Sequence, residues 1–272
     1  AVLFTFVTVE TNDWFTQRAL GMNLSESLHM NYREMMTLLC CWTLYSLPLA
    51  AIGLKTNSGA ITISGFIALS VAFVIAIMRG FAYTPIEFFH PILNVRVFAV
   101  MMVIGGAFFH TVWLKQHEAQ YSWAQTIYSA HVFVSILLFL SLLTGETRDI
   151  FELKMFAARR DLGYDIEPEL SSIENLKQLS LSSLWLIYAT VLMVVGIWRR
   201  VRGLRMLSII LFGFSILKIF VYDLSFLQTL YRIFSFIGLG IILLAASYMY
   251  QRYKSLIFGE AKVDESLNQG GG

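Results

Sequence analysis

The chain has 272 residues, of which 57% are apolar and only 14% are charged, whereas about a quarter of the residues of a soluble domain carry charge. Its net charge of +2 and the lack of a basic stripe interleaved with aromatic residues argue against a nucleic-acid partner. The apolar residues form long runs separated by turn residues and charges. This arrangement is typical of membrane-spanning helices and not of one large soluble core.

Seven apolar runs are long enough to cross a lipid bilayer. Each has roughly 18–23 residues, and a hydrocarbon core of about 30 Å needs about 20 helical residues. The runs occupy residues 34–54, 60–79, 94–114, 122–143, 179–198, 203–222 and 228–250. Residues 1–9 are also apolar but too short to span, and we interpret them as the second half of a spanning helix that begins before Ala1. The predicted fold class is therefore all-α, a polytopic integral membrane protein.

Basic residues in the short connections predict the orientation of the chain. We call the side that holds residues 10–33 side X and the opposite side, with its short loops, side Y. The basic residues expected on side Y are Lys55, Lys115, Arg199, Arg200, Arg202, Arg205, Arg252 and Lys254. Side X receives longer segments, and the longest, residues 144–178, has eight acidic residues against five basic ones. Because short positive loops stay in the cytoplasm, we expect side X to be extracytoplasmic and the C-terminus cytoplasmic.

Three short motifs recur in the same order along the chain and indicate an internal repeat. Their spacing varies only between 136 and 143 residues. The matching pairs are Thr8–Phe15 with Thr144–Phe151, Trp42–Tyr45 with Trp185–Tyr188, and Asn94–Phe98 with Leu230–Phe234. Four crossings return the chain to its starting side, so the pattern predicts two parallel four-helix repeats. We place the first unit at residues 1–115, the second at 116–254, and a polar tail at 255–272.

Each repeat unit is predicted to begin with a spanning helix that ends in a T-x-E-T-x-D turn. Residues 12–22 and 148–160 follow this turn and combine charged residues with large apolar ones. That composition favours helices that lie in the membrane interface on side X. Three spanning helices then complete each unit.

A family resemblance accompanies these motifs. The stretches LSSLWLIYATVLMVVG at 181–196, LKIFVYDLS at 217–225 and LYRIFSFIGLG at 230–240 resemble the C-terminal part of large bacterial membrane proteins catalogued as domain of unknown function 2339. The first repeat unit is similar to the family pattern only at 93–98. The resemblance implies a multi-pass protein of the bacterial inner membrane with further spans, and it brings no assigned activity, substrate or catalytic residue.

Two acidic pairs are the first candidate site. Glu10 with Asp13, and Glu146 with Asp149, stand three residues apart, so on a helix each pair shares one face. Paired carboxylates can hold a divalent cation or act as acid and base. The alternative is helix capping, with Thr11 or Thr147 as the N-cap and the aspartate in the positive first turn.

A second candidate site combines Lys218, Asp223 and Arg232, which are predicted to meet at the side-X end of the second unit. Ionisable groups inside spans are functional candidates by default, but an ion pair that joins two helices is the alternative reading. In the first unit Arg96 takes the position of Arg232, and we expect its partner to be Glu87 or His90. His110 and His131 lie deeper in consecutive spans, where a proton relay or a polar bridge between helices would use them.

Motifs for metals and cofactors are absent. The chain has no H-x-x-x-H, C-x-x-C or H-E-x-x-H spacing, no phosphate-binding loop and no nucleophile elbow, so neither a metal nor a cofactor is expected.

Two functions remain open. The preferred one is a non-enzymatic scaffold or transport subunit of a bacterial envelope assembly, with the lipid bilayer and other subunits of that complex as partners. The alternative is a membrane-embedded enzyme that acts on a lipid-linked or glycan substrate at the extracytoplasmic face, because the acidic pairs stand at the membrane surface on side X.

Overall fold

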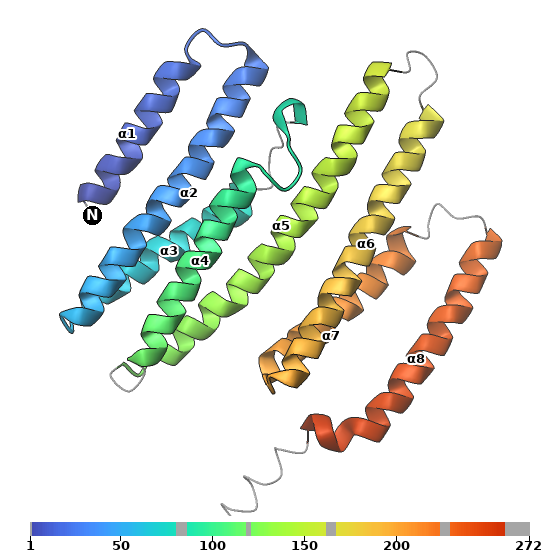
Figure 1. The fold of residues 1–272 in the computed structure, drawn as a ribbon. Helices are drawn as coiled ribbons and strands as arrows, with labels where there is room; N and C mark the ends of the chain where they lie inside the picture. The colour runs from blue at the N-terminus through green and yellow to red at the C-terminus, as the bar shows by residue number, and fades with distance from the viewer. Residues whose placement is uncertain (1, 80–85, 118–120, 162–166, 224–228, 259–272) are drawn as a thin grey trace, which may run out of the picture.

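The computed structural model describes residues 2–79, 86–117, 121–161, 167–223 and 229–258, with side chains of the last segment described over 236–252. These residues are almost entirely helical and contain no strand, which confirms the all-α class (Figure 1). The helices are α1 (Val2–Ala19), α2 (Leu24–Lys55), α3 (Gly59–Arg79), α4 (Val95–Gln116), α5 (Ala124–Asp161), α6 (Glu167–Trp198), α7 (Arg202–Lys218) and α8 (Thr229–Phe258). A short 3-10 turn, η1 (Ile86–Phe88), precedes α4, and a π-helical segment, η2 (Ile219–Asp223), extends α7.

The helices have the length and composition of membrane spans. Six of them, α2 to α7, are long and apolar enough to cross a bilayer, α7 together with η2. The seventh expected span falls in α8, whose described part Phe236–Arg252 is also apolar. The polytopic membrane architecture is thus confirmed, and residues 2–9 form the first half of α1 as a helix.

The prediction of a turn at each T-x-E-T-x-D motif is wrong. The prediction of separate interfacial helices after these motifs is wrong as well. The α5 helix has 38 residues and runs through Thr144–Phe151 without a break, which makes it about 57 Å long at 1.5 Å per residue. The α1 helix likewise continues through Thr8–Phe15. Thr144 satisfies its hydroxyl inside the helix and not as a cap, because its Oγ1 donates to the carbonyl of Leu140, four residues earlier, at 2.8 Å.

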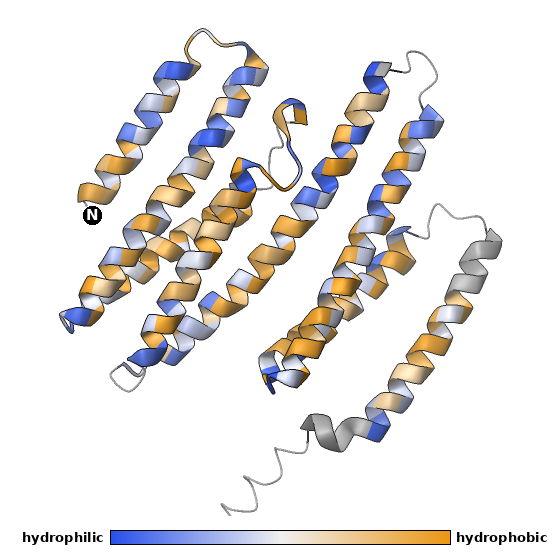
Figure 2. Cartoon of the chain, in the orientation of Figure 1, coloured by the Kyte–Doolittle hydropathy of each residue, from blue (hydrophilic) through white to orange (hydrophobic). Residues whose placement is uncertain are grey.

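The segments expected in the interface instead extend the spans beyond the apolar zone. Figure 1 shows α5 and α6 running side by side past the level at which α4 begins. Figure 2 shows hydrophobic residues along the lower parts of α5 and α6 and polar residues toward their upper ends. These two helices therefore project from the membrane region on side X.

Small residues let the helices of the first half approach closely. The core around α2 contains Met36, Leu39, Leu69, Ala72, Val100, Val103 and Leu138, all fully buried. A Cβ added to Gly65 of α3 would lie 2.8 Å from the backbone nitrogen of Ala50 in α2, and one added to Gly106 of α4 would lie 2.6 Å from Thr43 Cγ2. Helices in lipid associate through such close packing, because the surrounding acyl chains are as apolar as the side chains.

We predict that Gly65→Ala lowers the free energy of unfolding by about 1–3 kcal/mol, the usual cost of overpacking a tight site. The new methyl group meets the backbone of α2, which cannot rotate away as a side chain can. Thermal unfolding in detergent measures the effect. Gly105→Ala on α4 is the matched control, because nothing lies within 4 Å of a Cβ at that position. Equal midpoints for the two variants would contradict the packing argument.

Candidate functional site

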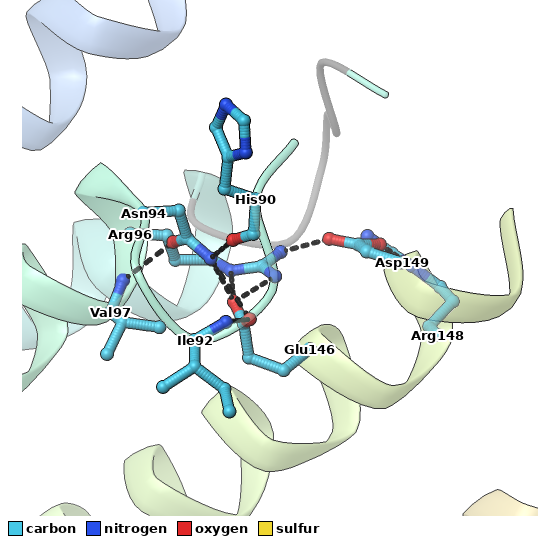
Figure 3. Close-up of polar contacts among 8 residues, drawn as sticks. All are labelled: His90, Ile92, Asn94, Arg96, Val97, Glu146, Arg148 and Asp149. Atoms are coloured by element: carbon cyan, nitrogen blue, oxygen red, sulfur yellow. Dashed lines mark hydrogen bonds and ion pairs between the residues drawn. The ribbon is translucent and has the colours of Figure 1, made fainter. Parts of the chain in front are cut away.

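Arg96, in the first turn of α4, is the centre of the best-defined polar cluster in the described chain. Its side chain is only 1% exposed. The guanidinium contacts two carboxylates of α5, with Nη2 2.5 Å from Glu146 Oε1 and Nη1 2.6 Å from Asp149 Oδ2 (Figure 3). Nε also donates to Glu146 Oε1 at 3.2 Å. Because the two acids stand three residues apart on one face of α5, a single planar guanidinium reaches both.

Glu146 also holds the chain that leads into α4. Asn94, the N-cap of α4, accepts a hydrogen bond from the backbone of Val97 at 3.0 Å. Its Nδ2 donates to Glu146 Oε1 at 2.8 Å, and the backbone N–H of Ile92 donates to Glu146 Oε2 at 3.1 Å. Ile92 has φ 68°, a left-handed conformation that a β-branched residue rarely adopts. The carboxylate of Glu146 therefore binds the arginine and also stabilises the strained turn at Ile92.

The charges of this cluster compensate one another. Arg148 Nε donates to Asp149 Oδ1 at 2.9 Å, so two guanidinium groups face two carboxylates. Asp149 is fully buried and Glu146 nearly so. Removing an ion from water costs several kcal/mol, and an apolar site tolerates charges when they are paired and hydrogen-bonded. The arrangement holds α4 against α5.

Two expectations about these residues are therefore wrong. Thr147 does not cap a helix, because it lies inside the continuous α5 helix, and Thr11 lies inside α1 in the same way. Arg96 does not pair with Glu87 or His90. Glu87 instead accepts from Ser25 Oγ at 3.1 Å, and His90 offers its backbone carbonyl to Asn94. Sequence proximity suggested the wrong partners, because the true ones lie about fifty residues away on the next helix.

The acidic pair of the first unit has different surroundings. Glu10 and Asp13 are exposed on α1, and within the described chain neither has an ion pair or hydrogen bond. The neighbouring Asn12 donates from Nδ2 to Glu34 Oε1 of α2 at 2.8 Å. Among the described residues, the second acidic pair lies beside an arginine and the first does not.

The second cluster forms where α7 passes into η2. Lys218 Nζ lies 2.8 Å from Asp223 Oδ1, as the sequence predicts, and Asp223 is fully buried. The two residues are five positions apart, which corresponds to the i to i+5 hydrogen-bonding period of a π-helix. The side chain of Arg232, the third expected member, lies outside the described residues.

Sequence reasoning missed the contribution of α6 to this cluster. Ser182 Oγ donates to Asp223 Oδ2 and accepts from Lys218 Nζ at 2.7 Å. Lys218 also reaches the carbonyl of Gln178 at 3.5 Å. A serine within an apolar helix is a weak signal in the sequence, because nothing there indicates which helix it faces. The cluster joins α6 to the end of α7.

Beside Arg96 the surface is hollowed into a recess of about 910 Å³. Polar residues lining it include His29, Arg33, Glu87, His90 and Asp149. Aromatic and aliphatic residues supply the rest of the wall, among them Phe88, which stacks on His29 at 4.3 Å between ring centroids, and the exposed Phe98. A mixed lining of this kind at the end of membrane spans suits an amphiphilic ligand better than a purely polar one.

The remaining polar residues of the described ranges include two buried histidines. Among the described residues no group of three or more His, Cys, Asp or Glu side chains could hold a metal ion. The rings of His110 and His131 lie 6.1 Å apart, both buried and flanked by Phe66. His110 Nε2 lies 3.4 Å from Ser46 Oγ of α2, so this histidine links α4 to α2.

The fold and its polar clusters define a polytopic α-helical membrane protein in which the buried Arg96 and Asp223 each have a partner of opposite charge. A family model described as "Predicted membrane protein (DUF2339)" matches residues 1–253. The chain belongs to this family, and the resemblance found in the C-terminal motifs extends over nearly all of it. No curated protein and no solved structure matches the chain.

We predict that Arg96→Gln lowers the free energy of unfolding by about 3–5 kcal/mol, because the buried carboxylates of Glu146 and Asp149 lose the guanidinium between them. Unfolding in detergent, followed by circular dichroism, measures the loss. Arg33→Gln is the control, since Arg33 is exposed and such surface changes stay within about 0.5 kcal/mol. If the two variants are equally stable, Arg96 does not hold α4 and α5 together.

Asp223→Asn is expected to lower stability by up to a few kcal/mol, because it removes the counter-charge of Lys218 from a buried site. Adding Lys218→Met should restore part of the loss, since the double variant has no unpaired cation. The same unfolding experiment checks both. A single variant as stable as the unmodified protein, combined with loss of its cellular role, would instead identify Asp223 as a ligand-binding residue.

Proposed function

We propose that the protein is a non-enzymatic subunit of a bacterial envelope assembly in the inner membrane, acting as a scaffold or transport module. The observation that carries this proposal is the pairing of the buried charges. Arg96 is held by Glu146 and Asp149, and Lys218 is held by Asp223. Groups engaged in this way stabilise helix contacts, whereas a general acid or base must be able to reach a substrate.

The two repeat units, 1–115 and 116–254, belong to the same proposal, and two repeated contacts support them. Trp42 Nε1 donates to Thr8 Oγ1 at 3.0 Å, and Trp185 Nε1 donates to Thr144 Oγ1 at 3.0 Å. Each of these pairs joins corresponding positions of the two sequence motifs. The same local geometry in both halves favours parallel units that pack alike.

Close approaches at the side-Y turns also support the repeat. A Cβ added to Gly196 would lie 3.0 Å from the backbone nitrogen of Arg205 in the next helix, and one added to Gly53 would come closer still to that of Thr62. In both units, then, a glycine lets the second helix pack tightly on the third. The polar tail 255–272 follows the second unit, and most of it lies outside the described residues.

The proposed orientation places side X outside the cytoplasm and the C-terminus inside. Ser171 is exposed near the side-X end of α6, and Arg202 is exposed at the side-Y start of α7. In a variant without Cys40 and Cys41, a cysteine at position 171 should react with an impermeant thiol reagent in intact cells. A cysteine at position 202 should react only after the membrane is opened. The opposite labelling pattern would reverse the two sides.

A second candidate function, an enzyme for a lipid-linked or glycan substrate, is favoured by the recess. Asp149 stands on its wall with His29 and His90, next to apolar surface that a lipid tail could cover. A substrate would enter along the exposed Phe98 and place its polar group near the histidines. This reading requires at least one of the polar lining groups to act on the substrate.

The two functions are separated by a variant that alters the recess and spares the ion pairs, His29→Phe with His90→Phe. If the scaffold proposal is right, this double variant should complement a deletion strain as well as the unmodified chain does. The two chains should be equally abundant in the membrane. Arg96→Gln should impair complementation only as far as its abundance falls. Full abundance of the double variant without complementation would overturn the scaffold proposal in favour of the enzyme.

A further inference from the structure

The recess beside Arg96 lies at the level where the spans begin on side X. Arg33 on its wall directly precedes the apolar run 34–54, and Val95, also on the wall, is the first residue of α4. Side chains at this level of a membrane protein meet lipid headgroups, whereas the following turns of each span meet acyl chains. The recess is therefore placed at the height of the headgroups of the side-X leaflet.

Two opposite charges on the wall of the recess are not paired with each other. Arg33 of α2 and Glu87 of η1 both line the recess, and both are exposed. Within the described ranges neither of them forms an ion pair, and the Glu87 carboxylate accepts one hydrogen bond, from Ser25 Oγ at 3.1 Å. The other wall charge, Asp149, already has two arginine partners. An occupant that carries an anion and a cation of its own would complement Arg33 and Glu87.

Two histidines on the same wall add hydrogen-bonding groups. His29 stacks on Phe88, and its Nδ1 is buried with no hydrogen-bond partner among the described residues. The exposed His90 ring points away from the cluster around Arg96 (Figure 3). A buried polar atom without a partner calls for an explanation, and a bound headgroup would supply the missing hydrogen bond.

An exposed apolar stripe on α4 continues from the recess into the membrane. Phe98 and Met101 line the recess and are exposed, and Phe108 is exposed further along the helix. Gly105 falls between them, and nothing lies within 4 Å of a Cβ at that position. The spacings of three, four and three residues place these positions on one face of the helix. From Phe98 to Phe108 the helix rises by about 15 Å, which is half of a hydrocarbon core of about 30 Å. The stripe therefore has the length of one leaflet.

We propose that the recess binds a phospholipid whose headgroup carries a phosphate and a primary ammonium, as in phosphatidylethanolamine, with an acyl chain along the α4 stripe. Arg33 donates to the phosphate, because a guanidinium matches its oxygens, and Glu87 accepts from the ammonium. An anionic headgroup would leave Glu87 without a cation, so charge complementarity favours the zwitterionic lipid. This inference depends on the membrane-spanning architecture and not on the scaffold role.

Lipid titrations of the full chain in detergent, after its native lipid has been removed, test the headgroup. Phosphatidylethanolamine should raise the midpoint of thermal unfolding by about 5 °C or more. Phosphatidylglycerol, which has the phosphate but no ammonium, should raise it less. Arg33→Gln should weaken the binding of both lipids about tenfold, whereas Glu87→Gln should remove the difference between them. Arg18→Gln and Glu169→Gln are the matched controls, since both residues are exposed on side X outside the recess, and they should bind lipid like the unmodified chain.

A second measurement locates the acyl chain. Phosphatidylethanolamine with a photoactivatable group in one acyl chain is added to membranes that contain the full chain, and the membranes are irradiated. The label should attach to residues 98–108 of α4. Arg33→Gln should reduce this labelling and leave unchanged any labelling of α7, where Ile210 and Phe214 are also exposed.

Three results would each overturn the proposal. The first is equal binding of the two lipids by the unmodified chain, and the second is a control variant that weakens binding as much as Arg33→Gln. The third is labelling that is even over all the lipid-facing helices, or that spares residues 98–108 because a second copy of the chain covers them. Neither readout uses complementation or cysteine labelling, so these failures would leave the proposed function standing.

Discussion

The buried guanidinium of Arg96 is the interaction that fixes the start of α4 against α5. Because Arg96 is buried at the end of its span, its charge needs anions beside it, and α5 supplies two on one helical face. The same carboxylate of Glu146 fixes the turn at Ile92 and the cap Asn94. One ionic cluster thus sets where α4 begins and which helix lies beside it.

Two kinds of interaction hold the helices together: close packing at small residues, and contacts between polar or charged side chains. In lipid the hydrophobic effect does not favour one apolar helix face over another, so the fit between the helix surfaces decides which helices pack together. Gly65 and Gly106 bring α3 and α4 close to α2, whereas ionic groups join α4 to α5 and α6 to the end of α7. Both ionic clusters lie toward side X, where the long helices project and where the recess opens. Any ligand or partner on that side meets surfaces that these clusters position.

The π-helical segment η2 shows how a local backbone change produces a buried ion pair. Lys218 and Asp223 would lie on different faces of a regular α-helix, since five residues turn through more than one full rotation. The wider turn places them together, 2.8 Å apart, and Ser182 of α6 completes the hydrogen bonding of both. Such segments often occur at functional sites, so this cluster is a place where a ligand is best sought.

Composition and the length of the apolar runs by themselves determined the class of the protein and the order of its spanning helices, because a bilayer imposes span length directly on sequence. The family resemblance came from the C-terminal motifs. The repeated motifs and the Lys218–Asp223 contact could also be predicted, since they depend on local order. Sequence did not predict that Glu146 and Asp149 face Arg96, that Ser182 joins the second cluster, or that α5 continues unbroken for 38 residues. These features depend on which faces of distant helices meet. A threonine- and acid-rich stretch is compatible with a turn or a helix, and both copies of this stretch are helical in the structure.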